Sequence, residues 1–376
     1  MKKIGAIVLA IILVIAFVLP YIWKEEPIAQ QMFDFGFKSS STFLSVQQGK
    51  PFVFVLDAGQ NIDRIELSLN GNLIKSWEAE EKAWVDGEAL TFQIPTQGYT
   101  LGTYSIQLSG FSSGKLMNND ERFLFVNANN GVQEQEFELL NTHPHNPNNF
   151  TQGYEFYNNL LFESTGNPNQ TNATKVARVD ENTGASVMEA FQPNPIFGEG
   201  ITILESKIYQ ISWQDQKCFV YNALDLSLID SLRYDGEGWG LCNNDEYIFM
   251  SNGTNELTIR DPENFEILKT IKVHSDRGPV TNLNELEFFN GRIYANVWIS
   301  EQRFQHDSRM NLNKIVIINP KTGAVEGVLD ISELIRKSGA KNVPNGIAYR
   351  KSSNSFWLTG KYWEQSFEVR LLPKNI

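Results

Sequence analysis

A short apolar segment with an aromatic residue at its second position recurs five times between residues 160 and 361. The copies lie roughly 40 to 60 residues apart, and most are followed by a second strand-like segment that ends in a polar turn. Repeats of this length, with four short strands each, are typical of β-propeller blades. No apolar period typical of helices is sustained, which excludes a helical solenoid, and the one helical candidate is 331–336. The sequence therefore predicts an all-β chain with a five-bladed β-propeller over residues 133–376. The five aromatic residues are Phe162, Tyr209, Phe249, Tyr294 and Trp357.

Two further positions repeat in register with these aromatic residues. The first precedes the aromatic residue by a constant offset in four copies, with a two-residue insertion in the fifth, and the second follows it by a constant offset in all five. Together they mark the two ends of a hairpin that leaves one end of the propeller and returns to it. We expect both sets to ring the central axis at that end. The first set is Gln152, Glu199, Trp239, Asn284 and Asn345, and the second is Gly166, Trp213, Gly253, Trp298 and Lys361.

The chemical types in this predicted ring favour a functional site over packing. Inter-blade packing alone calls for aliphatic or small side chains, whereas three tryptophans, one acid and one lysine occupy the ring. Glu199 stands between two glycines, where the backbone comes close to a neighbour, so a plain surface turn explains it less well. Asn345 is equally consistent with a turn cap. Glu163 is a second candidate acid, but its polar neighbours indicate a hydrogen-bonded structural role.

Residues 32–128 read as a separate all-β unit. About seven short segments alternate apolar and polar residues, and Asn70-Gly71 between two of them is a strong hairpin signal. Phe52–Leu56 is expected to form a short buried strand. This pattern predicts a small immunoglobulin-like β-sandwich that acts as a spacer or docking module.

Residues 1–26 predict a signal-anchor segment. Two lysines precede an apolar run that, extended to Trp23, is long enough to cross a bilayer. The run ends without the small residues of a signal-peptide cleavage site, and cleavage further on, near Ala29, is the alternative. We expect the chain to be periplasmic and anchored in the inner membrane by residues 4–23 alone, or secreted if the segment is cleaved.

Charge, cysteine and histidine content limit the partners. The net charge is −12 and no basic block stands out, which argues against a nucleic-acid partner. Cys218 and Cys242 lie in apolar strand patterns and predict two separate buried thiols, although one bridge stays open. His143 and His145 are spaced as metal ligands can be, but the neighbouring sequence offers no third ligand.

Eight short motifs, in order along the chain, resemble the glutamine cyclotransferase family of plants and bacteria. The resemblance covers roughly residues 137–372 and leaves out the predicted sandwich. Ser300–Asn313 and the region before Asn345 are longer than a compact member of the family needs. The motifs are Phe150-Thr151-Gln152-Gly153, Phe162-Glu163-Ser164-Thr165-Gly166, Phe197-Gly198-Glu199-Gly200, Gly238-Trp239-Gly240-Leu241, Leu283-Asn284-Glu285-Leu286-Glu287, Ala295-Asn296-Val297-Trp298, Asn345-Gly346-Ile347-Ala348 and Thr359-Gly360-Lys361-Tyr362-Trp363.

The resemblance implies a glutaminyl-peptide cyclotransferase, whose partners are peptides or proteins that begin with glutamine. The α-amine of that glutamine attacks its own side-chain amide, closes a lactam and expels ammonia. The resemblance implies Glu199 as the catalytic acid/base, and we expect Lys361 and Asn284 to stabilise the tetrahedral oxygen. No cofactor is required for this chemistry, and a structural calcium lower in the channel stays open. The expected substrate-binding residues are Gln152, Trp213, Trp239 and Trp298.

Two other functions stay open. A calcium-dependent lactonase propeller would ring a metal with hard oxygen ligands, which Gln152, Glu199, Asn284 and Asn345 could supply. Lys361 and three tryptophans on the same ring argue against a divalent ion there. A non-catalytic surface propeller that binds peptide or glycan is the third function, since a tryptophan cage also suits sugars.

Overall fold

The computed structural model describes residues 35–58, 61–78, 89–168, 174–193, 195–298, 306–339 and 342–373. Within these ranges the protein is nearly all-β, and α2 (Ser332–Ser338) is the one α-helix described, which confirms the helical candidate. No helix in the described part of the chain is long and apolar enough to cross a membrane. The predicted anchor at residues 4–23 falls outside the described residues.

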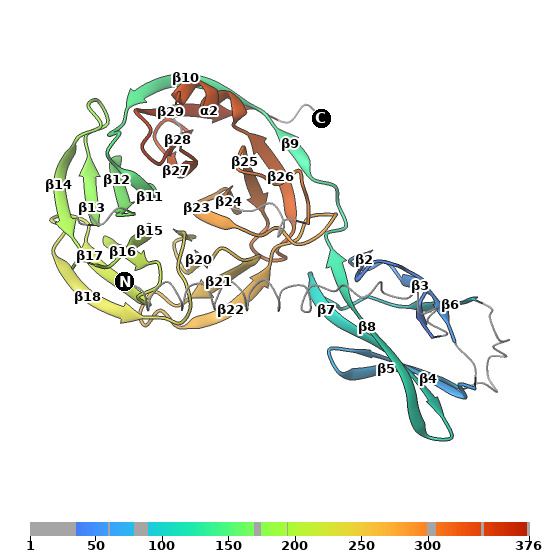
Figure 1. The fold of residues 1–376 in the computed structure, drawn as a ribbon. Helices are drawn as coiled ribbons and strands as arrows, with labels where there is room; N and C mark the ends of the chain where they lie inside the picture. The colour runs from blue at the N-terminus through green and yellow to red at the C-terminus, as the bar shows by residue number, and fades with distance from the viewer. Residues whose placement is uncertain are drawn as a thin grey trace, which may run out of the picture. The chain divides into compact units, whose positions relative to one another are not determined.

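Five sheets, each built on four antiparallel strands, dominate the chain from residue 137 onward (Figure 1). The five repeated aromatic segments form the second strand of each sheet, as the repeat predicts. The first two sheets are β11 (Phe150–Tyr157), β12 (Leu160–Gly166), β13 (Lys175–Val179) and β14 (Ser186–Phe191), then β15 (Gly198–Leu204), β16 (Lys207–Ser212), β17 (Lys217–Asn222) and β18 (Leu228–Arg233). The next two are β19 (Leu241–Asn243), β20 (Ile248–Ser251), β21 (Glu256–Arg260) and β22 (Ile267–Lys272), then β23 (Leu283–Phe289), β24 (Arg292–Val297), β25 (Lys314–Ile318) and β26 (Val325–Asp330).

The fifth sheet joins the two ends of this region. Its strands β27 (Pro344–Arg350), β28 (Ser355–Gly360) and β29 (Gln365–Leu371) come from the end of the chain, and β10 (Phe137–Pro144) comes from before the first repeat. β10 pairs with β29 from Phe137 opposite Leu371 to Pro144 opposite Gln365. A short strand, β9 (Gln133–Gln135), adds to β26 in parallel. The segment before the first repeat therefore completes the last sheet, and its pairing with β29 joins the two ends of this region by hydrogen bonds.

The first strand of each sheet contacts the first strands of its two neighbours. β11 contacts β15, β15 contacts β19, β19 contacts β23, β23 contacts β27, and β27 contacts β11. Figure 1 shows β11, β15, β23 and β27 near the common centre of the five sheets. Glycine permits the close approach, because a Cβ on Gly240 would overlap the carbonyl oxygen of Asn284 on the next sheet. The cycle of contacts brings the starts of five strands, far apart in sequence, to one place.

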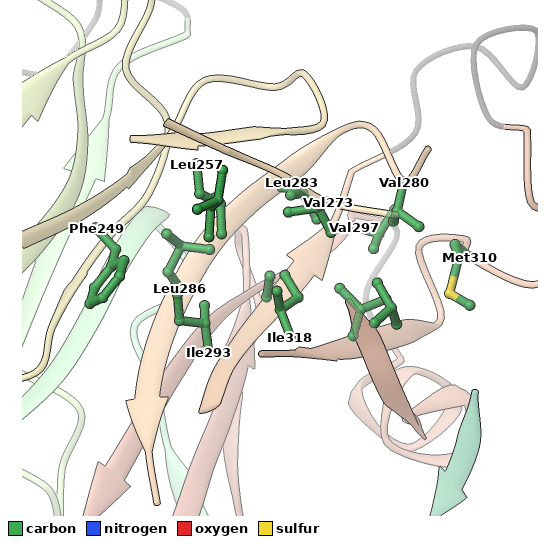
Figure 2. Close-up of a cluster of buried hydrophobic side chains, with 14 of the residues drawn as sticks. Phe249, Leu257, Val273, Val280, Leu283, Leu286, Ile293, Val297, Met310 and Ile318 are labelled. Carbon is green, nitrogen blue, oxygen red and sulfur yellow. The ribbon is translucent and has the colours of Figure 1, made fainter. Parts of the chain in front are cut away.

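Apolar side chains fill the space between neighbouring sheets. In the cluster of Figure 2, Phe249 and Leu257 of the third sheet pack with Leu286, Ile293 and other residues of the fourth. Removing such a side chain from water contributes on the order of 1.5–3 kcal/mol. Repetition of this packing between the sheets gives a rigid scaffold for whatever lies at their ends.

The strands before residue 128 form two further sheets. One contains β1 (Gly36–Phe37), β3 (Phe52–Asp57) and β6 (Ala89–Ile94), and the other contains β2 (Phe43–Gln47), β8 (Lys115–Asn127), β7 (Gly102–Ser112), β4 (Arg64–Leu69) and β5 (Asn72–Glu78). The predicted hairpin at Asn70-Gly71 is confirmed, since both residues have positive φ between β4 and β5. The strand predicted at Phe52–Leu56 is present as β3, but its expected burial holds for one face only: Val53 is 54% and Val55 37% exposed. Only one face of β3 is covered, so its alternate residues face solvent.

The chain divides into two compact units, each formed from more than one stretch of sequence. Of the described residues, one unit comprises 35–41, 53–58, 61–78, 89–93 and 106–122, and the other comprises 42–52, 94–105 and those from 123 onward. The five sheets all belong to the second unit.

Candidate active site

A cavity of about 570 Å³ lies where the first strands of the five sheets begin and the second strands end. All seven predicted site residues line it, although they come from five different sheets or the segments between them. Asn345, from the same predicted ring, does not line the cavity but lies directly behind Gln152. The residues brought together are Gln152, Glu199, Trp213, Trp239, Asn284, Trp298 and Lys361.

A β-bulge near the start of the first strand carries three of these side chains, Gln152, Glu199 and Asn284. In four of the five sheets the register between first and second strand slips by one residue at the same place. In β15 the slip lies between Gly198 and Ile201 and so contains Glu199 and Gly200. Bulges of this kind redirect a side chain next to active sites. Consequently Glu199 faces the cavity while Gly200 packs against the neighbouring strand at Gly240.

Glu199 and Lys361 are a buried acid and base in one cavity. Their residues are 6% and 5% exposed. Burial raises the pKa of the Glu199 carboxyl well above its ordinary value; the charge of Lys361 opposes this rise and that of Glu237 adds to it. Burial also lowers the pKa of the Lys361 ammonium to about 8, against the field of Glu199. Burial therefore favours the uncharged form of both groups.

Lys361 lies between two aromatic faces. Its Nζ is 4.5 Å from the ring centre of Phe150 and 5.9 Å from that of Trp298. Cation–π attraction at these distances favours the charged form and fixes the direction of the side chain. The ammonium is thus held at the cavity in a fixed place.

Aromatic side chains continue around the cavity on both sides of Lys361. Trp298 meets Trp239 edge to face with ring centres 5.2 Å apart. On the other side, Phe150 meets Phe197 at 6.1 Å and Phe197 meets Trp213 at 6.0 Å. These rings make the wall of the cavity largely apolar, which excludes water from the reacting groups.

The amide side chains supply polar contacts inside this apolar wall. Asn284 is 3% exposed, and its Oδ1 is a buried acceptor with no hydrogen-bond partner among the described residues. Gln152 is held from behind, because Asn345 donates its Nδ2 hydrogen bonds to the Gln152 Oε1 at 3.0 Å and to the Thr151 carbonyl at 3.0 Å. A buried acceptor without a hydrogen-bond partner, such as Asn284 Oδ1, costs free energy of folding. Asn284 therefore suits a ligand that brings an N–H donor into the cavity.

Glu163 belongs to a separate buried network. Its carboxylate accepts hydrogen bonds from Asn149 at 2.7 Å and Thr151 at 2.7 Å, and lies 3.1 Å from His145 Nε2. Burial would lower the pKa of His145, but Glu163 raises it above its ordinary value. The ion pair ties β12 to the segment before β11. These contacts agree with the hydrogen-bonded structural role expected for Glu163.

The remaining metal and thiol candidates lie elsewhere. His143 stacks on Trp357 at 3.8 Å between ring centres and approaches Glu368 at 3.4 Å. Among the described residues, no group of three or more His, Cys, Asp or Glu side chains is arranged to hold a metal. Cys218 and Cys242 are separate, buried free thiols, as expected from their strand patterns.

Sequence reasoning did not single out several groups at or next to this cavity, among them Phe150, Phe197 and Glu237. Phe150 and Phe197 stand two residues before Gln152 and Glu199, so the same register could have found them. Glu237 lies in the connection between the second and third sheets, outside the repeated strands. It accepts hydrogen bonds from two of the cavity tryptophans.

Comparison with known proteins gives consistent matches. The sequence profile of the family described as "Glutamine cyclotransferase" matches residues 117–371. A curated glutaminyl-peptide cyclotransferase of Arabidopsis thaliana is 32% identical over 243 residues, which cover 63% of this chain and 71% of that protein. The crystal structure of Myxococcus xanthus glutaminyl cyclase is similar with a TM-score of 0.57 and 32% identity, over 64% of this chain and 98% of that one. The family profile spans all five sheets, where the cavity lies.

Proposed function

Because this chain belongs to the glutamine cyclotransferase family and is an enzyme of that type, we propose that it cyclises the N-terminal glutamine of peptides or proteins to pyroglutamate. One observation carries the proposal: the cavity combines a carboxyl of raised pKa and an ammonium of lowered pKa inside an aromatic wall. Intramolecular amide attack needs a proton shuttle, an oxyanion donor and exclusion of water, and these three features supply them.

Glu199 is the proton shuttle in this proposal. The neutral α-amine attacks the side-chain carbonyl carbon, so that one C–N bond forms and the carbonyl oxygen becomes negative. Glu199 accepts a proton from the attacking nitrogen and delivers it to the amide nitrogen, whose bond to carbon then breaks to release ammonia. A carboxyl of ordinary pKa would be a poor donor in the second step, whereas the raised pKa of Glu199 suits both transfers.

Lys361 and Asn284 stabilise the tetrahedral oxygen. The ammonium of Lys361 is fixed against Phe150 and Trp298 and needs no reorganisation when the negative charge develops. Asn284 lines the same cavity, so that its amide donates a hydrogen bond to the oxygen while its unpartnered Oδ1 accepts one from the α-amine. In this arrangement an N–H of the α-amine faces Glu199, and the nitrogen lone pair is free to attack the side-chain carbonyl carbon.

The aromatic wall selects cyclisation over hydrolysis. Trp213, Trp239 and Trp298 enclose a folded glutamine and keep water away from the amide carbon. Gln152, braced by Asn345, offers polar contacts to the backbone beyond the glutamine. The open side of the cavity leaves the rest of the peptide outside.

The remaining expectations about architecture and location are part of the proposal. The closed cycle of first strands and the pairing of β10 with β29 support a five-bladed propeller. We retain the immunoglobulin-like sandwich at 32–128 as a spacer, and residues 4–23 as an inner-membrane anchor that holds the enzyme in the periplasm. A structural calcium in the channel stays a separate prediction.

Cyclisation should not depend on a metal ion bound in the cavity, because the positive charge of Lys361 in the cavity wall disfavours a divalent cation there. We expect full-length enzyme to release ammonia from a peptide that begins with glutamine at the same rate before and after prolonged EDTA or phenanthroline treatment. The same peptide with an acetylated N-terminus has no attacking amine and should release none. Loss of activity that zinc or calcium restores would favour metal chemistry, and binding without ammonia release would favour a non-catalytic propeller.

A further inference from the structure

Contacts around the mouth of the cavity form a ring that one carboxylate completes. Each side chain in the series touches the next through a ring–ring or cation–ring contact. The two ends of the series, Trp239 and Trp213, are joined through Glu237. The order around the cavity is Trp239, Trp298, Lys361, Phe150, Phe197 and Trp213.

Glu237 binds both indoles through one oxygen. Its Oε2 accepts hydrogen bonds from Trp213 Nε1 at 2.9 Å and from Trp239 Nε1 at 3.1 Å. Its Oε1 accepts one from Gln214 Nε2 at 2.9 Å. Hydrogen bonds to a charged acceptor are shorter and stronger than neutral ones. Trp213 is 38% exposed, so packing covers its indole only in part. The hydrogen bond to Glu237 helps to hold the indole in place.

We infer that Glu237 is a positioning residue for substrate binding, which fixes Trp213 and Trp239 as one continuous wall of the cavity. The inference rests on the proposed function, because that wall is taken to enclose the glutaminyl N-terminus. Gly238, which follows Glu237, donates its N–H to the Trp213 carbonyl at 3.0 Å, so the backbone holds the carboxylate at this place as well. Removing the carboxylate takes away the acceptor that the two indole N–H groups share, while the strands keep their own hydrogen bonds.

The charge of Glu237 also acts on the shuttle. Hydrogen bonds from Gln214 and the two tryptophans outweigh the effect of partial burial and lower the pKa of Glu237, which keeps it ionised. The negative charge of Glu237 then contributes to the rise in the pKa of Glu199. The other charged groups that face this region are Lys361, which opposes that rise, and Asp215, which lines the cavity. Neutralising Glu237 therefore moves the titration of Glu199 to lower pH.

Two substitutions and a matched control test the inference in full-length enzyme. In Glu237→Ala we expect KM for a glutaminyl peptide to rise about tenfold with a smaller change in kcat, because a charged hydrogen-bond acceptor is lost. In both Glu237→Ala and Glu237→Gln the acid limb of the kcat–pH profile should move to lower pH. Asp235→Asn neutralises an exposed acid of the same connection that does not line the cavity, and should change neither quantity.

Near-ultraviolet circular dichroism separates this inference from the proposed function, because it reports fixed indole packing without substrate. Glu237→Ala should lose part of the tryptophan signal at an unchanged unfolding temperature. Wild-type KM, acid limb and dichroism in both Glu237 variants would overturn the inference. If the wild type does not cyclise glutamine but Glu237→Ala still changes the dichroism signal, the proposed function is contradicted. The role of Glu237 in fixing the two indoles then stands.

Discussion

Glu199→Gln should lower kcat for glutamine cyclisation by about 10²-fold or more, the usual contribution of a positioned acid–base group. The substituted amide keeps the size of the carboxyl but carries no proton between the two nitrogens. Thermal stability should not fall. Because burial raises the pKa of Glu199 above its unfolded-state value, this carboxyl lowers stability once the pH rises past the unfolded-state pKa, and the neutral amide removes this cost.

Glu155→Gln is the matched control for this substitution. Glu155 is also a carboxyl on a first strand, and burial raises its pKa to about 8, but it lines a different cavity. We expect its kcat to stay near that of the wild type. Steady-state rates on one glutaminyl peptide decide the matter: near-wild-type turnover in Glu199→Gln would remove Glu199 from the mechanism.

Lys361→Met should lower kcat by about 10²-fold, the scale expected when one oxyanion donor is removed. Methionine fills a similar volume against Phe150 and Trp298 but carries no charge. The pH profile gives a second readout. Burial lowers the pKa of Lys361 to about 8, so the ammonium is present below that pH and lost above it. The alkaline limb of the wild-type kcat profile should therefore fall near pH 8.

Lys361→Arg tests the charge by itself. A guanidinium stays protonated far above the pKa of about 8 that Lys361 has here, so the residual activity of this variant should lack the alkaline limb. An alkaline limb that persists unchanged in Lys361→Arg, or a Lys361→Met enzyme with wild-type kcat, would show that the ammonium does not stabilise the transition state.

The repeat in the sequence was enough to find half of the residues that line the cavity. Glu199 and Lys361 are 162 positions apart, yet both follow from their offsets to Tyr209 and Trp357. The offsets carry this information because each hairpin of first and second strand has nearly the same length. The β-bulge, which the sequence does not reveal, recurs at the same place in four sheets, and in three of them it carries a side chain that lines the cavity, Gln152, Glu199 or Asn284.

The parts that the sequence did not predict depend on contacts outside the repeat. Glu237 lies in a connection between sheets, where no periodic position marks it, and its role appears only when two indole N–H groups meet it. The closing strand β10 pairs with β29 more than two hundred residues later and lacks the aromatic marker. At Val53 and Val55, the continuous apolar run indicated a buried strand, but the burial of each face depends on which sheet packs against it.

Mass spectrometry of a glutaminyl peptide incubated with the full-length enzyme tests the central claim most directly. Cyclisation removes one ammonia and adds nothing, whereas amide hydrolysis exchanges ammonia for water and leaves an N-terminal glutamate. The cavity around Glu199 and Lys361 predicts a product lighter by one ammonia, formed by the wild type and Glu155→Gln but strongly slowed in Glu199→Gln and Lys361→Met. A glutamate product, or a pyroglutamyl product formed equally fast by all four enzymes, would contradict it.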